Sequence, residues 1–303
     1  MSATTPAGSE GRPFGRLLTA MVTPFAADGS VDVDAGVQLA MDLVAQGCDG
    51  LVLAGTTGES PTTTAMEKAD LLRAVLAAVG PGVSVVAGVG TYDTAETLAL
   101  ARAAQRDGAH GLLVVTPYYS RPTQAGLLAH FTAAADATDL PVMLYDIPPR
   151  SVVPIAADTL RRLAEHPHIC AVKDAKGDLR EAATLIAETE MAWYSGDDPL
   201  NLPWLSVGAV GFVSVISHVA TAELRALIGA YEAGEVSRAR ELHRRTLPLV
   251  DAMARTGGVA FVKAALALLG RDVGTPRLPL VAPSPAELAM LADDLREAGI
   301  GHG

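Results

Sequence analysis

The sequence predicts an α/β protein, a (β/α)8 TIM barrel followed by a small C-terminal helical region. Short, almost continuously apolar segments alternate with longer segments whose apolar residues recur at helical spacing. This alternation is typical of a parallel sheet covered by helices. Eight such pairs fill roughly 220 residues, which matches the count and length of a barrel. A doubly wound open sheet is the alternative, because alternation alone does not close a sheet into a ring.

Eight segments have the length and composition of buried strands. Their apolar residues run nearly without interruption, as in strands that are covered on both faces, and turn residues bound most of them. The segments predicted as strands are 17–24, 50–54, 83–89, 111–116, 141–147, 169–175, 192–195 and 211–216.

The segments between these strands carry apolar residues at helical spacing. Thr64 and Glu67 match a capping box, which predicts a helix start, and Gly47 is a plausible C-terminal cap. The segments predicted as helices are 32–46, 64–79, 94–106, 125–137, 155–165, 179–188, 200–207 and 222–233.

The alternation stops after Gly234. Beyond it, three more segments look helical, at 238–256, 259–269 and 285–298. We therefore expect three parts: a disordered N-terminal segment (1–15), a catalytic barrel (16–234) and a C-terminal helical region packed on the barrel (235–303).

Composition argues against several classes of function. The chain has 303 residues, half of them hydrophobic, and a formal net charge of −11, which disfavours nucleic acid or an anionic membrane as a partner. Cys48 and Cys170 lie in apolar segments, as reduced cysteines of a cytosolic protein do. The N-terminal stretch has no apolar segment of the signal-peptide type, so we expect a cytoplasmic protein.

The sixth predicted strand, ICAVKDA at 169–175, carries Lys173 near its C-terminal end. A lysine among apolar residues needs an explanation, because a buried ammonium is costly to desolvate. Burial lowers the pKa of a lysine, and a neutral amine can form a Schiff base with a carbonyl substrate. The alternative is a lysine whose charged end reaches back to solvent.

In a barrel of this type, the C-terminal ends of the strands carry the active site. The residues at these ends are mostly hydroxyl-bearing, with a single lysine among them. They are Thr23, Thr56, Thr57, Thr91, Thr116, Tyr118, Tyr119, Tyr145, Lys173, Gly196, Asp197 and Ser214.

Hydroxyl groups suit imine chemistry, since they can relay protons without placing a competing charge beside the amine. Tyr145 ends the neighbouring strand, so its phenol can reach Lys173, or it can simply fill the barrel rim. The loop GTTGE at 55–59 can hold a carboxylate with backbone N–H groups, or it is an ordinary polar turn. A metal site would need several histidines or carboxylates; His218 alone follows a strand end, so we expect no metal.

Five motifs occur in order on these strand ends and together carry a family resemblance. The chain resembles the pyruvate-dependent class I aldolase superfamily and, within it, the dihydrodipicolinate synthase family in its actinobacterial form, from about Arg16 onward. The motifs are GTTGES at 55–60, TPYYSRPTQ at 116–124, YDIPPRS at 145–151, VKDAKGD at 172–178 and SGDD at 195–198.

The resemblance implies the catalytic roles. Lys173 would form the Schiff base with pyruvate, and Tyr145 would donate and accept protons. Thr56 and Tyr119 would complete the hydroxyl relay, with Tyr119 reaching in from a neighbouring subunit of a homotetramer, a dimer of dimers. No cofactor is implied, because the imine itself is the electron sink.

The same resemblance implies the binding roles. Thr57 and the backbone at Val213 would hold the pyruvate carboxylate, and Gly196 would contact substrate through its backbone. Arg150 would bind the carboxylate of L-aspartate 4-semialdehyde, as guanidinium–carboxylate geometry suits. Taken alone, Arg150 would be read as a solvated loop residue.

Three alternatives stay open. Sugar-acid aldolases such as N-acetylneuraminate lyase resemble this chain in the lysine and tyrosine, but they carry an apolar residue in place of Arg150 and usually serine in place of Thr56. A non-catalytic binder of keto acids would lack imine formation, and a metal-dependent aldolase would lose activity with a chelator.

The resemblance is weaker where lysine-inhibited members of the family bind lysine. This chain has Ala65 and Lys68 where they carry histidines, and Tyr92 where they carry asparagine. Ser60 and Glu96 are retained. Feedback inhibition by lysine is therefore in doubt.

Overall fold

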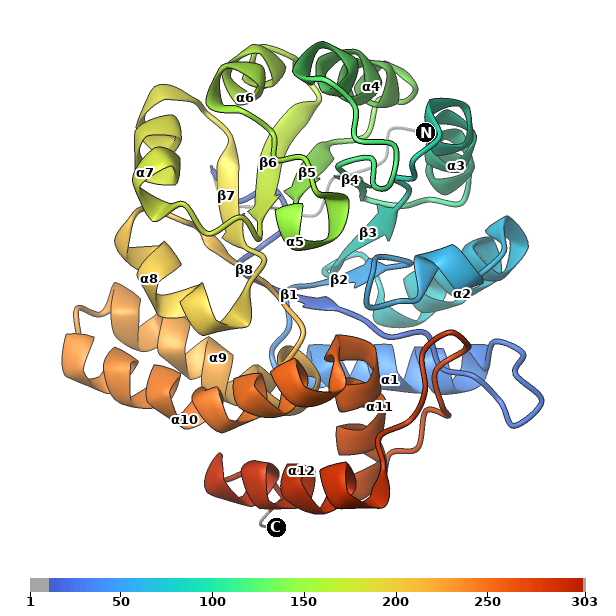
Figure 1. The fold of residues 1–303 in the computed structure, drawn as a ribbon, viewed down its shortest axis with the longest axis vertical. Helices are drawn as coiled ribbons and strands as arrows, with labels where there is room; N and C mark the ends of the chain where they lie inside the picture. Colours follow the sequence, from blue (N-terminus) through green and yellow to red (C-terminus); the bar gives the residue numbers. More distant parts are fainter. Residues whose placement is uncertain (1–10, 302–303) are drawn as a thin grey trace.

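The computed structural model, which describes residues 11–301, has the predicted fold: eight parallel strands form a closed barrel in chain order (Figure 1). The ring closes where β1 pairs with β8, with Leu18 opposite Val213. The open-sheet alternative is therefore wrong. The strands are β1 (Leu17–Ala20), β2 (Gly50–Leu53), β3 (Ser84–Gly88), β4 (Gly111–Val115), β5 (Val142–Asp146), β6 (Ile169–Asp174), β7 (Ala192–Ser195) and β8 (Gly211–Ser214).

Seven of the eight strands are shorter than predicted, and β1 and β8 lose the most at their C-terminal ends, because residues there bond to groups outside the sheet. β1 ends at Ala20 rather than at 24, and the N–H of Val22 donates to the ring of His218. β8 ends at Ser214 rather than at 216, since the next two N–H groups donate to the carboxylate of Asp198. The apolar composition of the residues that follow β1 and β8 therefore indicates that they are buried, but it does not indicate how far the strands extend.

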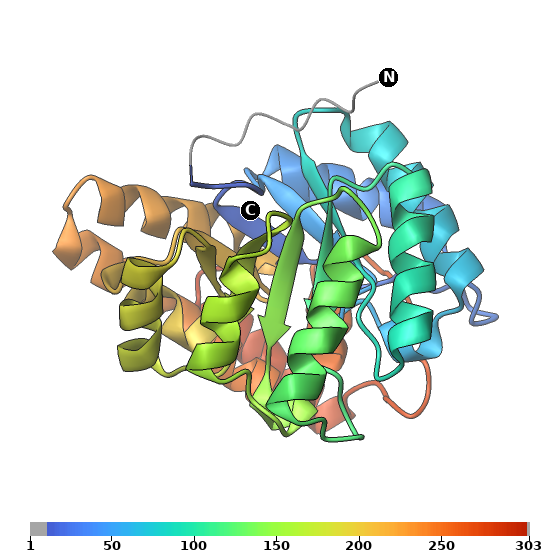
Figure 2. The same cartoon turned by 90° about the horizontal axis from the view of Figure 1, so that it is seen from above.

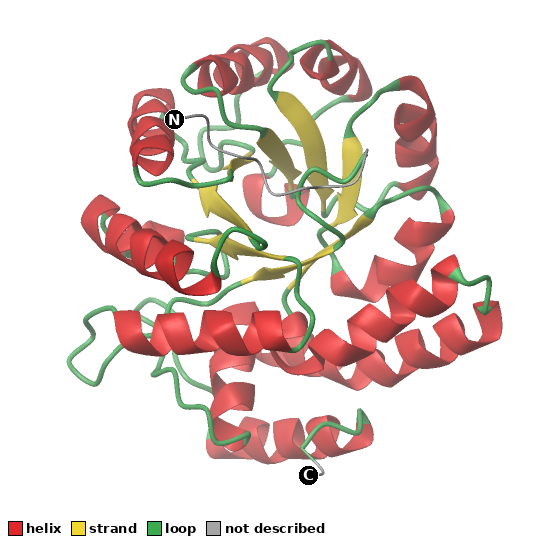
Figure 3. Ribbon diagram, turned by 180° about the vertical axis from the view of Figure 1, so that it is seen from behind, coloured by secondary structure: helices red, strands yellow, loops and turns green. Residues whose placement is uncertain are grey.

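Helices surround the strands, as Figure 3 shows with strands in yellow and helices in red. Thr64 makes the capping box with Glu67 that the sequence predicts. The long helices of this ring are α1 (Val33–Ala45), α2 (Ala65–Val79), α3 (Thr94–Arg106), α4 (Gln124–Asp136), α6 (Ala157–Ala164), α7 (Leu179–Glu188) and α9 (Ser217–Glu232), with a shorter helix α8 (Asn201–Ser206).

Short helical turns occupy three loops that follow strands, where the sequence analysis expected no helix or placed one later. They are η1 (Ser60–Thr62), α5 (Pro148–Ser151) and η2 (Asp198–Leu200). In addition, α9 begins at Ser217, five residues before the predicted start, with a kink at Ala220. These turns all lie near the C-terminal ends of the strands, so they shape the opening of the barrel.

The three C-terminal helices are α10 (Val236–Thr256), α11 (Gly258–Leu268) and α12 (Pro285–Glu297). Figures 1 and 2 show α10 running beside α9, in orange, and Figure 1 shows α12 beyond α10, on the side away from the strands. The division at residues 234 and 235 stays a prediction. None of the helices within residues 11–301 combines the length and apolar character that a membrane span needs.

The interior of the barrel is filled with side chains rather than open. Phe14 is buried at the end where the strands begin, and a side chain on Gly111 would come within 2.4 Å of its ring. Residues 1–10 of the segment predicted to be disordered lie outside the described residues. Because the barrel is plugged at this end, a pocket for a small molecule is expected at the other end, where the strands finish.

Candidate active site

Lys173 lies near the C-terminal end of β6 and is buried, with only 4% of its surface exposed. Its strand neighbours in the register are Tyr145 on β5 and Tyr194 on β7. The Nζ atom lies 4.2 Å from the centre of the Tyr145 ring. The side chain does not reach solvent, so the alternative of a solvated strand-end lysine is wrong.

The surroundings of Lys173 favour its neutral form. Burial lowers the pKa of the amine to about 8, opposed by the charge of Asp198 and assisted by the charge of Arg150. At pH 7.5, a pKa near 8 leaves roughly a quarter of the amines neutral, against about 0.1% for an ordinary lysine. The site therefore supplies a nucleophile near neutral pH.

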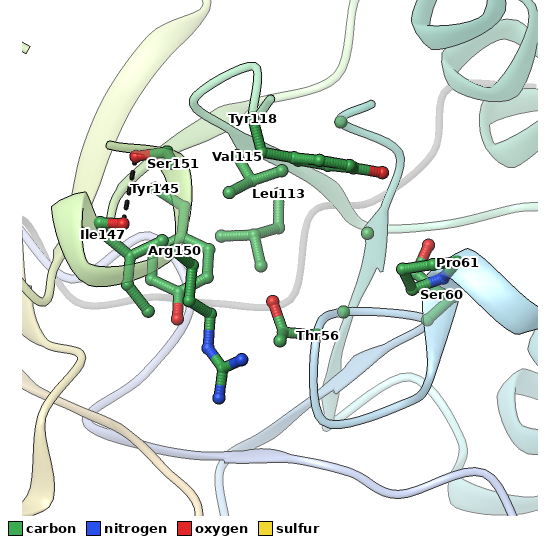
Figure 4. Close-up of a pocket in the computed structure, with 14 residues that line it drawn as sticks. Thr56, Ser60, Pro61, Leu113, Val115, Tyr118, Tyr145, Ile147, Arg150 and Ser151 are labelled. Carbon is green, nitrogen blue, oxygen red and sulfur yellow. Dashed lines mark hydrogen bonds between the residues drawn. The ribbon is translucent and has the colours of Figure 1, made fainter. Parts of the chain in front are cut away.

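Tyr145 presents its phenol to the same space. Figure 4 shows the phenol oxygen, the Thr56 hydroxyl and the Arg150 guanidinium facing one another across a small gap. Burial raises the pKa of Tyr145 well above its usual value, while Arg150 and Thr56 oppose the shift. The phenol is thus protonated near neutral pH and can donate a proton to a departing oxygen.

A cavity of about 200 Å³ opens beside these groups. Its walls are mainly apolar, with a few polar groups that converge on one side, as in small-molecule sites generally. The lining residues are Ala54, Gly55, Thr56, Ser60, Pro61, Gly88, Gly90, Leu113, Val115, Tyr118, Tyr145, Ile147, Arg150 and Ser151. Thr56, Tyr145 and Arg150 are the predicted site residues among them.

The other predicted binding residues lie outside the cavity wall. Thr57 and Val213 are buried. Gly196 lies against Lys173: a side chain on Gly196 would come within 2.8 Å of Cγ of Lys173. Its N–H donates to the carbonyl of Asp174 at 2.7 Å, so its own carbonyl is the group left to meet a substrate.

Tyr119 is 90% exposed and has a left-handed backbone, with φ of 70°. Its neighbour Tyr118 instead lines the cavity and packs edge-to-face on Tyr92, with ring centres 5.4 Å apart. Within a single chain, Tyr119 points away from the groups that surround Lys173. The structure does not bring it to the predicted site, and its role there stays a prediction.

Arg150 owes its place to a turn that the sequence analysis missed. Two prolines begin α5, since proline suits the first turn of a helix. Ser151 then donates its hydroxyl to the carbonyl of Ile147 at 3.0 Å and fixes the turn. The pair of prolines after the fifth strand was the signal that could have revealed it.

Asp198 lies in the SGDD motif, but the sequence analysis gave it no role. It is buried, and its Oδ2 accepts the N–H groups of Val215 and Ile216 at 2.8 and 3.0 Å, while Oδ1 accepts the side-chain amide of Asn201 at 3.0 Å. Its negative charge supports the protonated form of Lys173.

His218, the one metal candidate in the sequence, has both ring nitrogens engaged. Nε2 accepts the N–H of Val22 at 3.1 Å, so the proton is on Nδ1, which donates to the carbonyl of Val215 at 2.7 Å. Burial lowers its pKa to about 4. Within residues 11–301, no group of three histidine, cysteine or acidic residues is placed to hold a metal ion.

Comparison with known proteins places these residues in a family context. The model of the dihydrodipicolinate synthetase family matches residues 13–298. The chain is 60% identical to the 4-hydroxy-tetrahydrodipicolinate synthase of Corynebacterium jeikeium and 61% identical to that of Mycolicibacterium paratuberculosis. Each match spans 287 residues, 95% of this chain and 96% of the relative.

Solved structures give the same result. A dihydrodipicolinate synthase from Bacillus anthracis matches with a TM-score of 0.92 and 42% identity, covering 93% of this chain and 98% of that one. The enzyme from Cyanidioschyzon merolae, solved with lysine bound, matches with a TM-score of 0.92 and 40% identity over 94% of this chain and 98% of that one.

Proposed function

The chain belongs to the dihydrodipicolinate synthetase family, and we propose that it carries out the reaction for which its relatives are named. It is a lyase that condenses pyruvate with L-aspartate 4-semialdehyde to give 4-hydroxy-tetrahydrodipicolinate, a step of diaminopimelate and lysine biosynthesis. The observation that carries this conclusion is the buried amine of Lys173, held under the ring of Tyr145 at the open end of the barrel. The sugar-acid aldolase alternative is not favoured.

The first step is imine formation. The neutral amine of Lys173 attacks the keto carbon of pyruvate, and the resulting carbinolamine loses water to give the imine. The departing oxygen needs a proton, which the phenol of Tyr145 can supply because its raised pKa keeps it protonated. The Thr56 hydroxyl, which faces that phenol, can then pass a proton back to it.

The second step forms the carbon–carbon bond. A proton leaves the methyl group of the bound pyruvate and gives an enamine, whose carbon attacks the aldehyde of L-aspartate 4-semialdehyde. Arg150 points its guanidinium into the cavity, where it can bind the carboxylate of this second substrate. Thr57 and the backbone at Val213 and Gly196 would hold the pyruvate part.

In the last step, the amino group of the condensed product displaces Lys173 from the imine and closes the ring. The amine of Lys173 is thereby regenerated, and every electron pair is supplied by the substrates and the protein. This route uses no cofactor and no metal. Small molecules are its only substrates, and a cytoplasmic location suits such a biosynthetic step.

A homotetramer built from tight dimers completes the proposal. Tyr119 is the most exposed of the large apolar or aromatic side chains in the described part of the chain, which suits a residue that enters the site of a neighbouring copy. A monomeric variant is known among solved dihydrodipicolinate synthases, so assembly has to be measured. Analytical ultracentrifugation of the native protein and of Tyr119→Phe, with activity assayed on both, tests the role.

The decisive experiment is reduction with borohydride in the presence of pyruvate, followed by peptide mapping. We expect one reduced pyruvate adduct, on Lys173. An unmodified Lys173 under these conditions would refute the mechanism. In a parallel assay, aldol cleavage of a sialic or 2-keto-3-deoxy acid faster than condensation with the semialdehyde would refute the choice of substrate.

A further inference from the structure

A buried ion pair joins the C-terminal helices to the loop that follows β2. Lys263 on α11 places Nζ 2.8 Å from Oε1 of Glu59, and the two side chains are only 2% and 1% exposed. Glu59 lies three residues after Thr56 in the GTTGE loop. Neither residue lines the cavity of the candidate site, and the mechanism above uses neither.

The carboxylate of Glu59 is held from a second side as well. Its Oε2 accepts the backbone N–H of Arg277 at 2.8 Å, and Lys263 donates to the carbonyl of Thr275 at 3.2 Å. The ring of Phe25 contacts both cations, 4.0 Å from Nζ of Lys263 and 4.3 Å from the guanidinium carbon of Arg277. Residues of the C-terminal region thus hold the end of the loop through an ion pair, a hydrogen bond and shared contacts with the ring of Phe25.

The loop itself is a tight turn. Glu59 has a left-handed backbone with φ of 56°, which a residue with a side chain adopts only when its surroundings hold it there. The N–H of Glu59 donates to the carbonyl of Thr56 at 3.1 Å, and the hydroxyl of Thr23 donates to the carbonyl of Gly58 at 2.6 Å. Because the turn is this short, a shift of Glu59 is transmitted directly to Thr56.

We propose that Glu59 and Lys263 are positioning residues: their buried ion pair fixes the GTTGE loop so that the hydroxyl of Thr56 faces the phenol of Tyr145. This inference rests on the proposed function, since it assigns the loop a part in proton relay. A displacement of the relay by a fraction of an ångström slows the steps that need it, because proton transfer depends steeply on geometry. The amine that forms the imine is not displaced.

The test separates positioning from mere stability. Lys263→Met and Glu59→Gln each leave one buried charge without its opposite charge, whereas the double variant leaves no unpaired charge. Leu266→Ala, which empties a buried position on the same helix, is the matched control for destabilisation. Each purified protein is assayed for folding, for kcat and KM of the condensation, and for the final extent of borohydride trapping with pyruvate.

We expect both single variants to lose roughly 10- to 100-fold in kcat, with little change in the KM for pyruvate and with full trapping on Lys173. The double variant should regain stability but not kcat. Leu266→Ala should keep a kcat within about threefold of the native value at a temperature where it is folded.

Several results would overturn the inference. A native kcat in the double variant would show that the ion pair does not position the relay. A loss of kcat in Leu266→Ala as large as that in Lys263→Met would show that stability alone explains the effect. Absence of trapping in the native protein would refute the proposed function instead. If the single variants fail to fold, the double variant, with no unpaired charge, decides the question.

Discussion

Two lysines are buried in this molecule in almost the same way, yet their surroundings prepare them for different tasks. Lys173 in the barrel and Lys263 in α11 are 4% and 3% exposed. Each places its Nζ over an aromatic ring, at 4.2 Å from the centre of Tyr145 and 4.0 Å from that of Phe25. Burial lowers the pKa of both amines.

The difference lies in the partner. Lys263 is ion-paired with Glu59. The carboxylate of Glu59 opposes the effect of burial on the pKa of Lys263 and holds its amine in the ion pair. Over residues 11–301, Lys173 forms no ion pair, and the charge of Asp198 opposes the effect of burial on its pKa without direct contact. Burial alone therefore does not make a nucleophile. A buried amine becomes one when the fold gives it no direct ion-pair partner and leaves a cavity beside it for a carbonyl substrate.

The largest expected effect comes from replacing the nucleophile. Lys173→Arg should lower kcat by at least about 1000-fold, because a guanidinium stays protonated and cannot form the imine. Peptide mapping after borohydride reduction should find no pyruvate on Lys263, since its amine is ion-paired. Transfer of the adduct to Lys263 would break the comparison between the two lysines.

The aromatic partner of Lys173 gives the next largest effect. Tyr145→Phe keeps the ring over the amine but removes the hydroxyl, so we expect kcat to fall by roughly 100- to 10,000-fold. Tyr194→Phe is the matched control, because the Tyr194 hydroxyl donates to the carbonyl of Gly15 at 2.9 Å, at the opposite end of the barrel. Equal losses in the two variants would contradict a specific role for the Tyr145 phenol.

The pH dependence sharpens the comparison further. Because the pKa of Lys173 is about 8, the rate of imine formation should rise about tenfold per unit between pH 6 and 7 and level off above pH 8. Quenched-flow trapping with pyruvate alone measures this rate. A rate that keeps rising to pH 10 would mean that Lys173 titrates like an ordinary lysine.

The smallest effect concerns a third lysine, Lys68, which is half-buried on α2 with the charge of Glu96 nearby. Unlike the two buried lysines, it stands where the family resemblance implies a histidine in lysine-inhibited members. We expect added L-lysine to change the condensation rate by less than the roughly fivefold at the low end of ordinary allosteric coupling. Stronger inhibition, measured as rate against lysine concentration, would contradict this prediction.

Much of this architecture could be predicted from the sequence, because the barrel repeats one simple pattern. The count of eight strands, the capping box at Thr64 and the C-terminal helices all follow from periodicity and local signals. The position of Lys173 beside Tyr145 follows from strand order, since adjacent parallel strands end at the same rim. In this fold class, local sequence signals and the order of the repeats therefore predict much of the secondary structure and which strands are neighbours.

What could not be predicted depends on contacts between distant segments. The end of β8 is set by Asp198, which captures two N–H groups that would otherwise extend the sheet. The ion pair between Glu59 and Lys263 could not be predicted either, because no sequence signal near one residue indicates the other as its partner. The left-handed backbone of Tyr119 could not be predicted either, because no residue preference signals it.

The bond between Glu59 and Arg277 spans 218 residues of chain, and this length has a consequence for synthesis. A ribosome adding about 5 to 20 residues per second needs roughly 10 to 40 seconds to make the stretch between them. During that interval the GTTGE loop already exists but lacks the segment that clamps it. On the proposed mechanism, the nascent chain would contain Lys173 well before the segment that fixes Thr56, and this segment would be complete once Arg277 has been added, before α12 is made.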